Sequence, residues 1–369
     1  MVIIAIDSVY QLVNAMNIAY NEFPEEHIVV LIKSIHEKTF KREKMNKNKF
    51  VHSIYYTNKK YEKHIYEIMW QIWALLFPRA ATSQLFNDEL IDLDVSAIIA
   101  STTWIGVLSP VYRSYANRPK LYFIEEGLGT YVKQELVFGE KSKINLVKFK
   151  MLRRQELVNK AIFRFTLPEY MLNQDLKFQK PPYLSNTNEF KYALIDFFGG
   201  RKDVVEFSNS EIIYFEQVFN IGNHDAEKAF FEQESLIRDL LLSNRNAKVK
   251  SHPRYFNALS NKYPVVETIT PWEAVFLSID INNKILISIS STSLVTPKIM
   301  QNKEPIVICL VKIFRKFLKQ LLPSSSHKEI DNIIDFFYYI KTTYNEPERF
   351  KIPNSVQELN KILMELDNA

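Results

Sequence analysis

Two adjacent acids follow an apolar segment and precede two of the seven glycines in the chain. Residues 121–124 have the composition of a buried strand, and Glu125 and Glu126 come directly after it. Neighbouring carboxylates repel each other in a dry site, so one of them accepts a proton readily, as a general base must. Gly127 and Gly129 permit a tight turn close to a ligand. A solvated turn would use the same residues, so this segment alone leaves both interpretations open.

A histidine follows a second predicted strand. Residues 248–250 form that strand, and Ser251, His252, Pro253 and Arg254 come next. An imidazole, a guanidinium and nearby backbone N–H groups could hold a phosphate, and the imidazole could protonate it as it leaves. Pro253 favours an extended backbone at His252. A bare His-Pro pair is a weak signal, and its place after a strand strengthens it.

A run of hydroxyl side chains follows a third predicted strand. Ser290, Ser291 and Thr292 come after the strand predicted at 285–289, and a helix-like segment follows them. Hydroxyl groups and a helix N-terminus together favour an anion. Helix capping by serine or threonine would explain the same residues.

The elements that must position these segments alternate between strands and helices. A strand at 2–6, a helical stretch through residue 20 and a strand at 28–32 indicate a βαβ unit with parallel strands. In open parallel sheets, ligands bind beyond the carboxyl ends of the strands. The three candidate segments lie at such ends. Other strands are predicted at 97–100, 121–124, 212–215, 248–250, 265–269, 285–289 and 305–310, and helices at 61–77, 141–165, 225–242, 272–278 and after 310.

A chain of 369 residues suits two domains. Its composition changes at 177–188, which contains Pro181 and Pro182, and a linker is predicted there or shortly after it. The predicted fold class is α/β, with an N-terminal Rossmann-like αβα domain at 1–190 and a C-terminal one at 191–369.

Composition limits the function classes. Cys309 is the single cysteine, which excludes an intramolecular disulfide and a thiolate metal cluster and fits a reducing, cytoplasmic compartment. Residues 1–7 do not resemble a signal peptide, and no run of about 18 apolar residues occurs, so no membrane span is expected. The net charge of +5 fits either ordinary surface lysines or attraction to anions. The basic residues are scattered, and nucleic-acid binding is not expected.

Together the three segments resemble the bacterial sialyltransferases of glycosyltransferase families 38 and 52, the capsule polysialyltransferases and the lipooligosaccharide sialyltransferases. Those families carry an acid-acid-Gly motif, a His-Pro motif and a Ser/Thr pair in this order. The counterparts here are Glu125-Glu126-Gly127, His252-Pro253 and Ser290-Ser291. The sequence at 124–131 is most similar to the polysialyltransferase form, whereas Arg254 and the opening at 8–12 are more similar to family 52.

The resemblance implies a GT-B enzyme, with two Rossmann-like domains facing a central cleft, that inverts the anomeric centre without a metal or cofactor. Its donor would be CMP-sialic acid, bound by the C-terminal domain, and its acceptor a capsular polysaccharide or lipooligosaccharide. One motif acid would deprotonate the acceptor hydroxyl, with Glu125 ranked before Glu126. His252 would stabilise or protonate the phosphate, and Ser290 and Ser291 would bind it through hydrogen bonds.

Two segments support weaker predictions. Glu273 lies at the start of the helix predicted at 272–278, whose N-terminus could face the nucleotide, although ordinary helix initiation would also use Pro271 and Glu273. Residues 312–322 form an amphipathic basic helix that could contact the inner face of the cell membrane or simply lie at the protein surface. Its cations are Lys312, Arg315, Lys316 and Lys319.

Three alternatives stay open. Asp92-Leu93-Asp94 supplies the Asp-X-Asp motif of a metal-dependent GT-A transferase, but it precedes a strand instead of following one. A related GT-B enzyme could use another donor, such as CMP-Kdo or a CDP-polyol. A non-catalytic glycan- or lipid-binding protein would need neither Glu125 nor His252. The acceptor, the linkage, single transfer or polymerisation, and the oligomeric state, with a homodimer as one option, are not fixed by the sequence.

Overall fold

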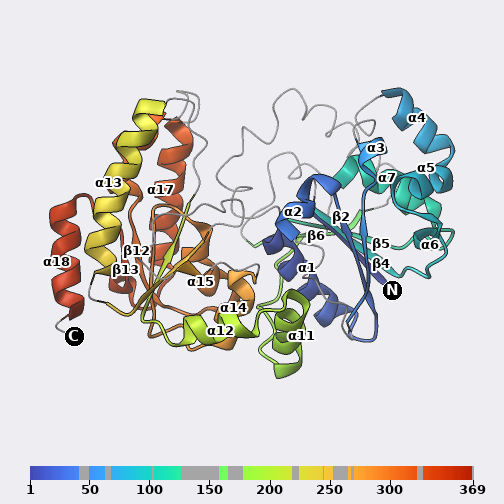
Figure 1. Ribbon diagram of the computed structural model, residues 1–369. Helices are drawn as coiled ribbons and strands as arrows, with labels where there is room; N and C mark the ends of the chain where they lie inside the picture. Colours follow the sequence, from blue (N-terminus) through green and yellow to red (C-terminus); the bar gives the residue numbers. More distant parts are fainter. Residues whose placement is uncertain are drawn as a thin grey trace. The chain divides into compact units, whose positions relative to one another are not determined.

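A computed structural model shows how the chain is organised, and it divides into two compact units, Met1–Gly199 and Gly200–Ala369 (Figure 1). The sequence analysis placed this boundary at residue 190, within the helix α11 (Asn188–Phe198) that closes unit 1. The structure describes residues 1–40, 50–62, 68–101, 104–125, 158–164, 178–217, 224–243, 245–251, 265–266, 270–321 and 327–367.

The sheet of unit 1 has seven parallel strands in the order β3-β2-β1-β4-β5-β6-β7. The strands β1, β2 and β4 are continuous apolar runs that are buried along their whole length, as parallel strands covered on both faces must be. The order reverses between β1 and β4, which is the topological switch point of doubly wound folds. The strands are β1 (Val2–Ile6), β2 (Ile28–Ile32), β3 (Val51–Tyr56), β4 (Ala97–Ser101), β5 (Lys120–Ile124), β6 (Val158–Ile162) and β7 (Phe178–Gln179).

Helices cover both faces of this sheet. The helix α1 (Val9–Glu22) contacts β1 and β4. It begins with a capping box in which Ser8 and Gln11 bond each other's backbone N–H groups, a feature that contributes about 1 kcal/mol. On the other face, Ile3, Ala5 and Phe123 pack against α5–α7 in one apolar core. The remaining helices described are η1 (Ser34–His36), α2 (Glu37–Phe40), α3 (Lys59–Glu62), α4 (Ile68–Leu76), α5 (Pro78–Leu85), α6 (Asp88–Ile91) and α7 (Ile105–Ser114).

Unit 2 repeats the strand order of unit 1 without repeating its sequence. Its six parallel strands follow the order β10-β9-β8-β11-β12-β13, so that the reversal falls between β8 and β11. Both units therefore have the topology of a doubly wound Rossmann-like domain. The strands are β8 (Ile212–Phe215), β9 (Ala247–Lys250), β10 (Val265–Val266), β11 (Ile285–Ser288), β12 (Ile306–Cys309) and β13 (Phe350–Lys351).

Side chains on the two faces of the second sheet identify its helical layers. Lys248 pairs with Glu206 of α12 at 2.9 Å, whereas Tyr214, on the other face, bonds Glu234 of α13. The helices are α12 (Arg201–Ser208), α13 (His224–Leu242), α14 (Trp272–Ser278), η5 (Thr292–Leu294), α15 (Thr296–Gln301), α16 (Val311–Leu321), α17 (His327–Thr342), η7 (Pro347–Arg349) and α18 (Val356–Asp367).

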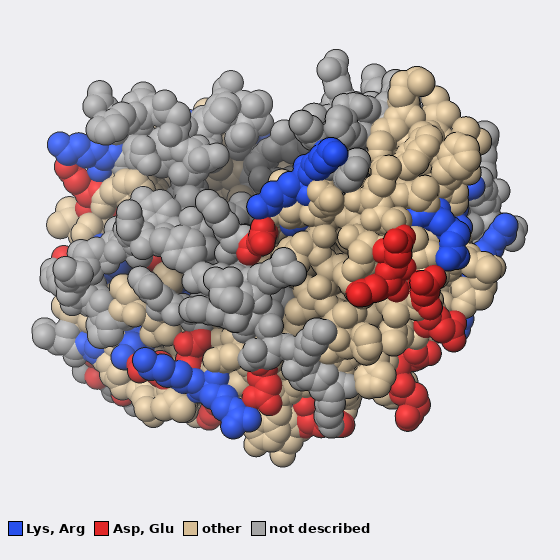
Figure 2. Space-filling view, turned by 45° about the vertical axis from the view of Figure 1, so that its right-hand side comes forward, with Lys and Arg blue, Asp and Glu red and all other residues tan. Residues whose placement is uncertain are grey.

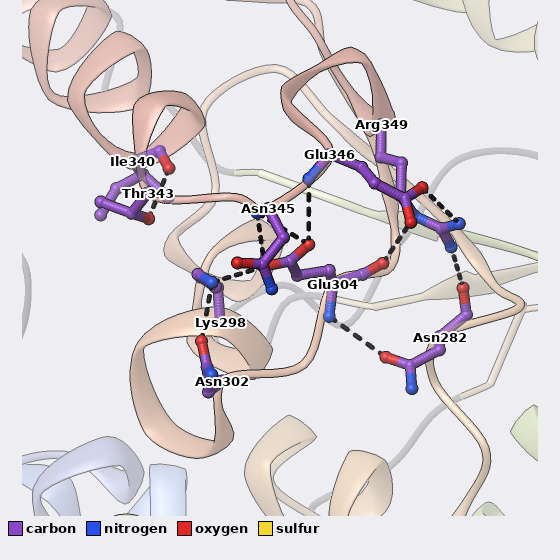
Figure 3. A network of polar contacts seen from close by, with 9 residues as sticks. All are labelled: Asn282, Lys298, Asn302, Glu304, Ile340, Thr343, Asn345, Glu346 and Arg349. Carbon is purple, nitrogen blue, oxygen red and sulfur yellow. Dashed lines mark hydrogen bonds and ion pairs between the residues drawn. The ribbon is translucent and has the colours of Figure 1, made fainter.

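A polar network around Glu304 fixes the segment after α17 to the loop before β12 (Figure 3). The Glu304 carboxylate accepts from Lys298 Nζ at 2.6 Å and from the backbone N–H of Asn345 at 2.9 Å, and its carbonyl accepts from Arg349 Nε at 2.9 Å. Burial alone would raise the pKa of Glu304, but these hydrogen bonds outweigh it and lower the pKa below its ordinary value.

Two glycines stand where unit 1 ends and unit 2 begins. Gly199 ends α11 with φ at 65°, the left-handed conformation that glycine adopts without strain. Gly200 lies so close to Thr270 that a Cβ atom there would be 2.0 Å from the Thr270 hydroxyl oxygen. Thr270 in turn donates a hydrogen bond to Asp203 on α12.

The predicted α/β class with two Rossmann-like domains is confirmed, and most predicted strands lie where they were expected. The helix predicted at 141–165 is wrong at its end, because β6 occupies Val158–Ile162 and pairs with β5. Residues 141–157 of that prediction lie outside the described residues. The edge strands β3 and β7 and the short strand β13 were not predicted.

Candidate active site

Glu125 lies at the carboxyl end of β5, and its side chain is completely buried, with 0% exposure. The strand lies between β4 and β6 in the sheet. All strands of this sheet are parallel, so the residues that follow β1, β5 and β6 share the edge at which ligands bind in such folds. Glu125 therefore stands at the functional edge of unit 1.

Two neighbours hold the Glu125 carboxylate. Tyr10, in the first turn of α1, donates its hydroxyl hydrogen to Oε1. The backbone N–H of Arg164, just after β6, donates to Oε2 at 2.9 Å, and Arg164 Nε lies 3.4 Å from Oε1. Hydrogen bonds to an ionised group are stronger than those between neutral groups. Three segments that are distant in sequence thus meet at one carboxylate.

Tyr10 and Arg164 are themselves fixed within unit 1. The Arg164 side chain is 5% exposed, and its Nη2 donates to Asn14 Oδ1 of α1 at 3.0 Å. Burial, followed by the charge of Glu125, raises the pKa of Tyr10 well above its ordinary value. Tyr10 therefore keeps its proton and serves as a hydrogen-bond donor at any physiological pH.

A second charged group lies at the end of β1. One oxygen of Asp7 is 3.1 Å from Lys33 Nζ, and the other is 3.5 Å from His36 Nε2. Lys33 also lies over the ring of Trp104, 5.1 Å from its centroid. The carboxyl edge of unit 1 thus carries two groups in which an acid is paired with bases.

In unit 2, the predicted hydroxyl run lies at the carboxyl end of β11, next to the switch point. Gln217, which follows β8, accepts from the backbone N–H of Ser290 at 2.8 Å and donates to its hydroxyl oxygen at 2.8 Å. Ser288 donates to the Phe215 carbonyl at 2.9 Å. Gln217 therefore holds Ser290 across the point where the strand order reverses.

The neighbouring hydroxyls are more accessible than the strand they follow. Ser291 is half-buried and Thr292 is exposed. The Ser291 hydroxyl caps the short helix η5 by accepting from the backbone N–H of Ser293 at 3.2 Å. The capping interpretation thus applies to Ser291, while Thr292 has an exposed hydroxyl at the same edge.

Charged side chains are buried beside the end of β9. Burial lowers the pKa of Lys250 to about 8, against the opposing charges of Glu273 and Asp203. Glu273 stands in the first turn of α14 and is buried. The predicted nucleotide ligand Glu273 is therefore close enough to act electrostatically on the lysine two positions before His252.

Five of the predicted site residues lie outside the described part of the chain. They are Glu126, Gly127, His252, Pro253 and Arg254. The strands that lead to them are described: β5 ends at Ile124 and β9 at Lys250. Of the predicted site residues, the structure thus places Glu125 in unit 1 and Glu273, Ser290, Ser291 and Thr292 in unit 2.

Three cations of α16, the helix predicted as a membrane-surface candidate, have partners on neighbouring elements. Arg315 and Lys319 pair with Asp331 of α17 at 2.8 and 2.9 Å, and Lys312 Nζ donates to Tyr338 Oη at 2.7 Å. On the face of the molecule shown in Figure 2, the described Lys and Arg side chains lie in separate groups among Asp and Glu. These contacts favour the interpretation of α16 as an ordinary surface helix.

Sequence reasoning missed Tyr10, Arg164 and Gln217. Each follows a strand of the structure by two to four positions. Tyr10 belongs to the opening at 8–12 that the sequence analysis noted only as a resemblance. Arg164 was missed because a helix instead of a strand was predicted at 141–165.

The described helices include none that is both long and apolar enough to cross a lipid bilayer. Among the described residues, no three His, Cys, Asp or Glu side chains are arranged to bind a metal ion together.

Comparison with known proteins gives one family. The family model described as alpha-2,8-polysialyltransferase (POLYST) matches residues 112–310, more than half of the 369-residue chain. The match runs from α7 to the end of β12 and includes the acid-acid-Gly, His-Pro and hydroxyl segments. No curated protein matches the sequence.

Several solved structures match most of the chain at low sequence identity. A protein from Listeria monocytogenes described as a UDP-N-acetylglucosamine 2-epimerase is 10% identical, with 96% of this chain and 98% of that chain covered and a TM-score of 0.46. Arabidopsis thaliana UGT89C1 complexed with UDP is 10% identical, with 94% and 91% covered and a TM-score of 0.47. The spinosyn forosaminyltransferase SpnP is 11% identical, with 98% and 99% covered and a TM-score of 0.41. The fold class rests on the strand order of the two sheets.

Proposed function

Because the chain belongs to the alpha-2,8-polysialyltransferase family, we propose that this glycosyltransferase is an inverting, metal-independent enzyme that moves sialic acid from CMP-sialic acid to a bacterial surface glycan. The observation that carries the proposal is that this family's match includes all three predicted motifs. The motif residues that the structure describes, Glu125, Ser290 and Ser291, stand at the carboxyl edges of two Rossmann-like sheets. The family description names an α-2,8 linkage, which favours a sialylated acceptor such as a capsular polysaccharide over a lipooligosaccharide.

In the proposed reaction, an acid of the Glu125–Glu126 pair takes the proton of the acceptor hydroxyl as that oxygen attacks the anomeric carbon of sialic acid. The bond from this carbon to the phosphate oxygen breaks, and CMP leaves with the electron pair. Inversion follows from attack on the face opposite the leaving group. The acid–base group should contribute about a hundredfold or more to the rate.

Unit 2 is proposed to bind the donor. His252 would stabilise or protonate the departing phosphate, with Pro253 and Arg254 beside it. Ser290 is held by Gln217, and Thr292 presents an exposed hydroxyl at the same edge. Fixed donors aimed at the developing phosphate charge are the larger part of such catalysis.

The first test is CMP release from CMP-sialic acid in EDTA, with an oligosialic acid acceptor. We expect turnover by the wild type and a fall of at least about a hundredfold in His252→Ala and in Glu125→Ala. The exposed Thr342→Ala on α17, far from either motif in the sequence, is the matched control and should retain the wild-type rate. Activity only with CMP-Kdo or a CDP-polyol would replace the proposed donor. Glycan binding that survives both substitutions without any turnover would replace the enzyme with a binding protein.

Contact with the inner face of the cell membrane stays a prediction. The pairing of Arg315 and Lys319 with Asp331 leaves α16 less charge for anionic lipid than its sequence suggested. A flotation assay with vesicles of phosphatidylcholine and phosphatidylglycerol would decide it.

A further inference from the structure

The helix α4 exposes large apolar side chains to solvent. Met69, Ile72 and Leu76 are 77%, 49% and 68% exposed, and Phe77, directly after the helix, is 56% exposed. Positions 69, 72 and 76 are three and four residues apart, so their side chains share one face of the helix. The other exposed large hydrophobic side chains that the structure describes are more scattered along the chain. These four residues together are called the α4 stripe.

The opposite face of α4 is apolar as well, and it packs against the rest of unit 1. The helix lies beside α5 at the edge of this unit and also contacts α7 (Figure 1). Trp70 packs against the apolar core, and Ala74 is buried. The sequence has no charged residue between Glu67 and Arg79. A helix that is apolar on all sides is ordinarily surrounded by protein or by lipid. The folded unit covers one face of α4 and leaves the stripe open.

The size of the α4 stripe favours lipid over a second protein chain as its partner. A stable protein interface takes about 20–30 residues from each side, whereas the stripe has four. Lipid needs no complementary surface, because apolar side chains gain by leaving water in proportion to the area they bury. Trp70 and Trp73, on the same helix, are half-buried, and indole rings favour the boundary between lipid and water.

Charge contributes little to this surface. Lys59 of α3 and Arg79 of α5 stand on either side of α4 in the sequence, and each is paired with an acid, Glu37 at 3.0 Å and Asp92 at 3.3 Å. Binding through the α4 stripe would therefore come from apolar burial and would tolerate salt. Binding through the basic helix α16 would instead depend on anionic lipid and would weaken as salt is added.

We propose that the α4 stripe is a membrane-contacting surface that inserts into the boundary between the headgroups and acyl chains of a phospholipid bilayer. With nine residues, α4 is about 14 Å long, less than half the thickness of the hydrocarbon core, so it lies along the membrane surface without crossing it. Contact through α4 does not depend on which donor the enzyme uses.

The test compares a double variant of the stripe, Met69→Gln with Leu76→Gln, with the wild type. Glutamine is a good helix former, so α4 should persist. The matched control is Leu236→Gln with Met364→Gln, because both residues are 67% exposed and lie on the helices α13 and α18 of unit 2. Flotation with phosphatidylcholine vesicles, with and without phosphatidylglycerol and at low and high salt, measures binding.

Tryptophan fluorescence gives a second measurement that is specific for α4. Of the four tryptophans of the chain, Trp104 and Trp272 are buried, whereas Trp70 and Trp73 are half-buried on α4. Vesicles that contain brominated phosphatidylcholine quench only indole rings that come close to the acyl chains. Quenching would therefore report contact through this helix.

We expect the wild type and the control to float with phosphatidylcholine vesicles at both salt concentrations. The stripe variant should bind at least about tenfold more weakly, because two large apolar side chains no longer leave water. Brominated lipid should quench the emission of the wild type and the control and leave that of the stripe variant unchanged. Its thermal midpoint should match that of the wild type, since exposed side chains contribute little to stability.

Three results would overturn the proposal. The first is a wild type that binds none of the vesicles, and the second is a stripe variant that binds as tightly as the wild type. Binding that requires phosphatidylglycerol and disappears at high salt belongs to the second case and would return the membrane contact to α16. The third is a wild type that sediments as a dimer without lipid while the stripe variant sediments as a monomer, which would make the stripe an interface between two copies of the chain.

Discussion

Each unit of the molecule contains a tyrosine in contact with a buried glutamate and a buried arginine, and the two sets differ in what they connect. In unit 1, Tyr10 and Arg164 bind Glu125 from two other segments of the chain. In unit 2, Tyr214 of β8 donates to Glu234 of α13 at 2.6 Å, and Arg238, one turn later on the same helix, donates to it at 2.9 Å.

The difference shows that location decides the role of a charged cluster more than its composition does. The unit 2 set lies between the sheet and a helix, where it fixes α13 to β8. The unit 1 set lies at the carboxyl edge and fixes the segment in which the predicted chemistry begins. Equivalent substitutions should therefore have equal effects on stability and unequal effects on activity.

The largest effect is expected from removing either arginine. Arg164→Met and Arg238→Met each leave a buried glutamate without its cation, which should lower the free energy of unfolding by about 3–5 kcal/mol. Only Arg164→Met should reduce CMP release per folded molecule, because only that arginine supports the strand-end motif. Denaturant unfolding and initial rates at a temperature where both variants are folded measure this. An equal loss of rate in Arg238→Met would break the comparison.

The second-largest expected effect is a pH-dependent change in stability caused by Lys250, a buried charge at the end of β9 in unit 2. Its pKa is lowered by burial from 10.5 to about 8, so the unfolded chain binds more protons between these values, and this lysine's contribution to stability rises with pH across that range. Below pH 8 the folded state carries the full cost of the charge. The stability of Lys250→Met relative to wild type should therefore fall by about 3 kcal/mol from pH 8 to pH 10.5.

Unfolding by denaturant at several pH values measures the change in Lys250→Met. Lys250→Arg is the control, since arginine keeps its charge throughout this range. A difference that does not vary with pH would show that Lys250 is solvated in the folded state.

The smallest expected effect is the pH dependence of stability that Glu234 causes. Burial raises the pKa of Glu234 above the ordinary 4.5, so its contribution to stability is complete below pH 4.5 and is lost as the pH rises through the folded-state value. The wild type should thus lose stability relative to Glu234→Gln as the pH increases from 4.5 to 7. Glu304→Gln should show the opposite sign, and below pH 4.5: the pKa of Glu304 is lowered, so the wild type loses stability relative to this variant as the pH falls from 4.5. The same sign in both variants would contradict the assigned environments.

The sequence predicts the sheets well because buried parallel strands are continuous apolar runs. The strands at Val2–Ile6, Ile28–Ile32 and Ile212–Phe215 have the predicted bounds. β6 was not predicted because its residues Val158–Ile162 include the polar pair Asn159-Lys160, although the segment pairs with both β5 and β7. Propensity is a weak guide where tertiary pairing decides the conformation.

For the candidate site, strand ends were a sufficient guide to Glu125 and Ser290 but not to their partners. Tyr10 meets Glu125 across 115 positions of sequence, and Gln217 meets Ser290 across 73. Such pairs depend on which strands are neighbours in the sheet, and the strand order could not be predicted from this single sequence. The contacts of Tyr10 and Arg164 with Glu125 therefore became visible only with the assembled sheet.

The contact between Gly200 and Thr270 limits which amino acids can occupy these two positions. A side chain at position 200 would overlap Thr270 with no flexible end to move aside, and Thr270 is tied to Asp203 at the start of the second unit. In a saturation library screened for folded protein, position 200 should therefore accept glycine alone unless position 270 changes with it. Because the Thr270 Cγ2 and Cβ atoms would also lie 2.6 and 2.8 Å from that Cβ, only glycine at 270 should open position 200 to alanine. The two sites are thus expected to covary.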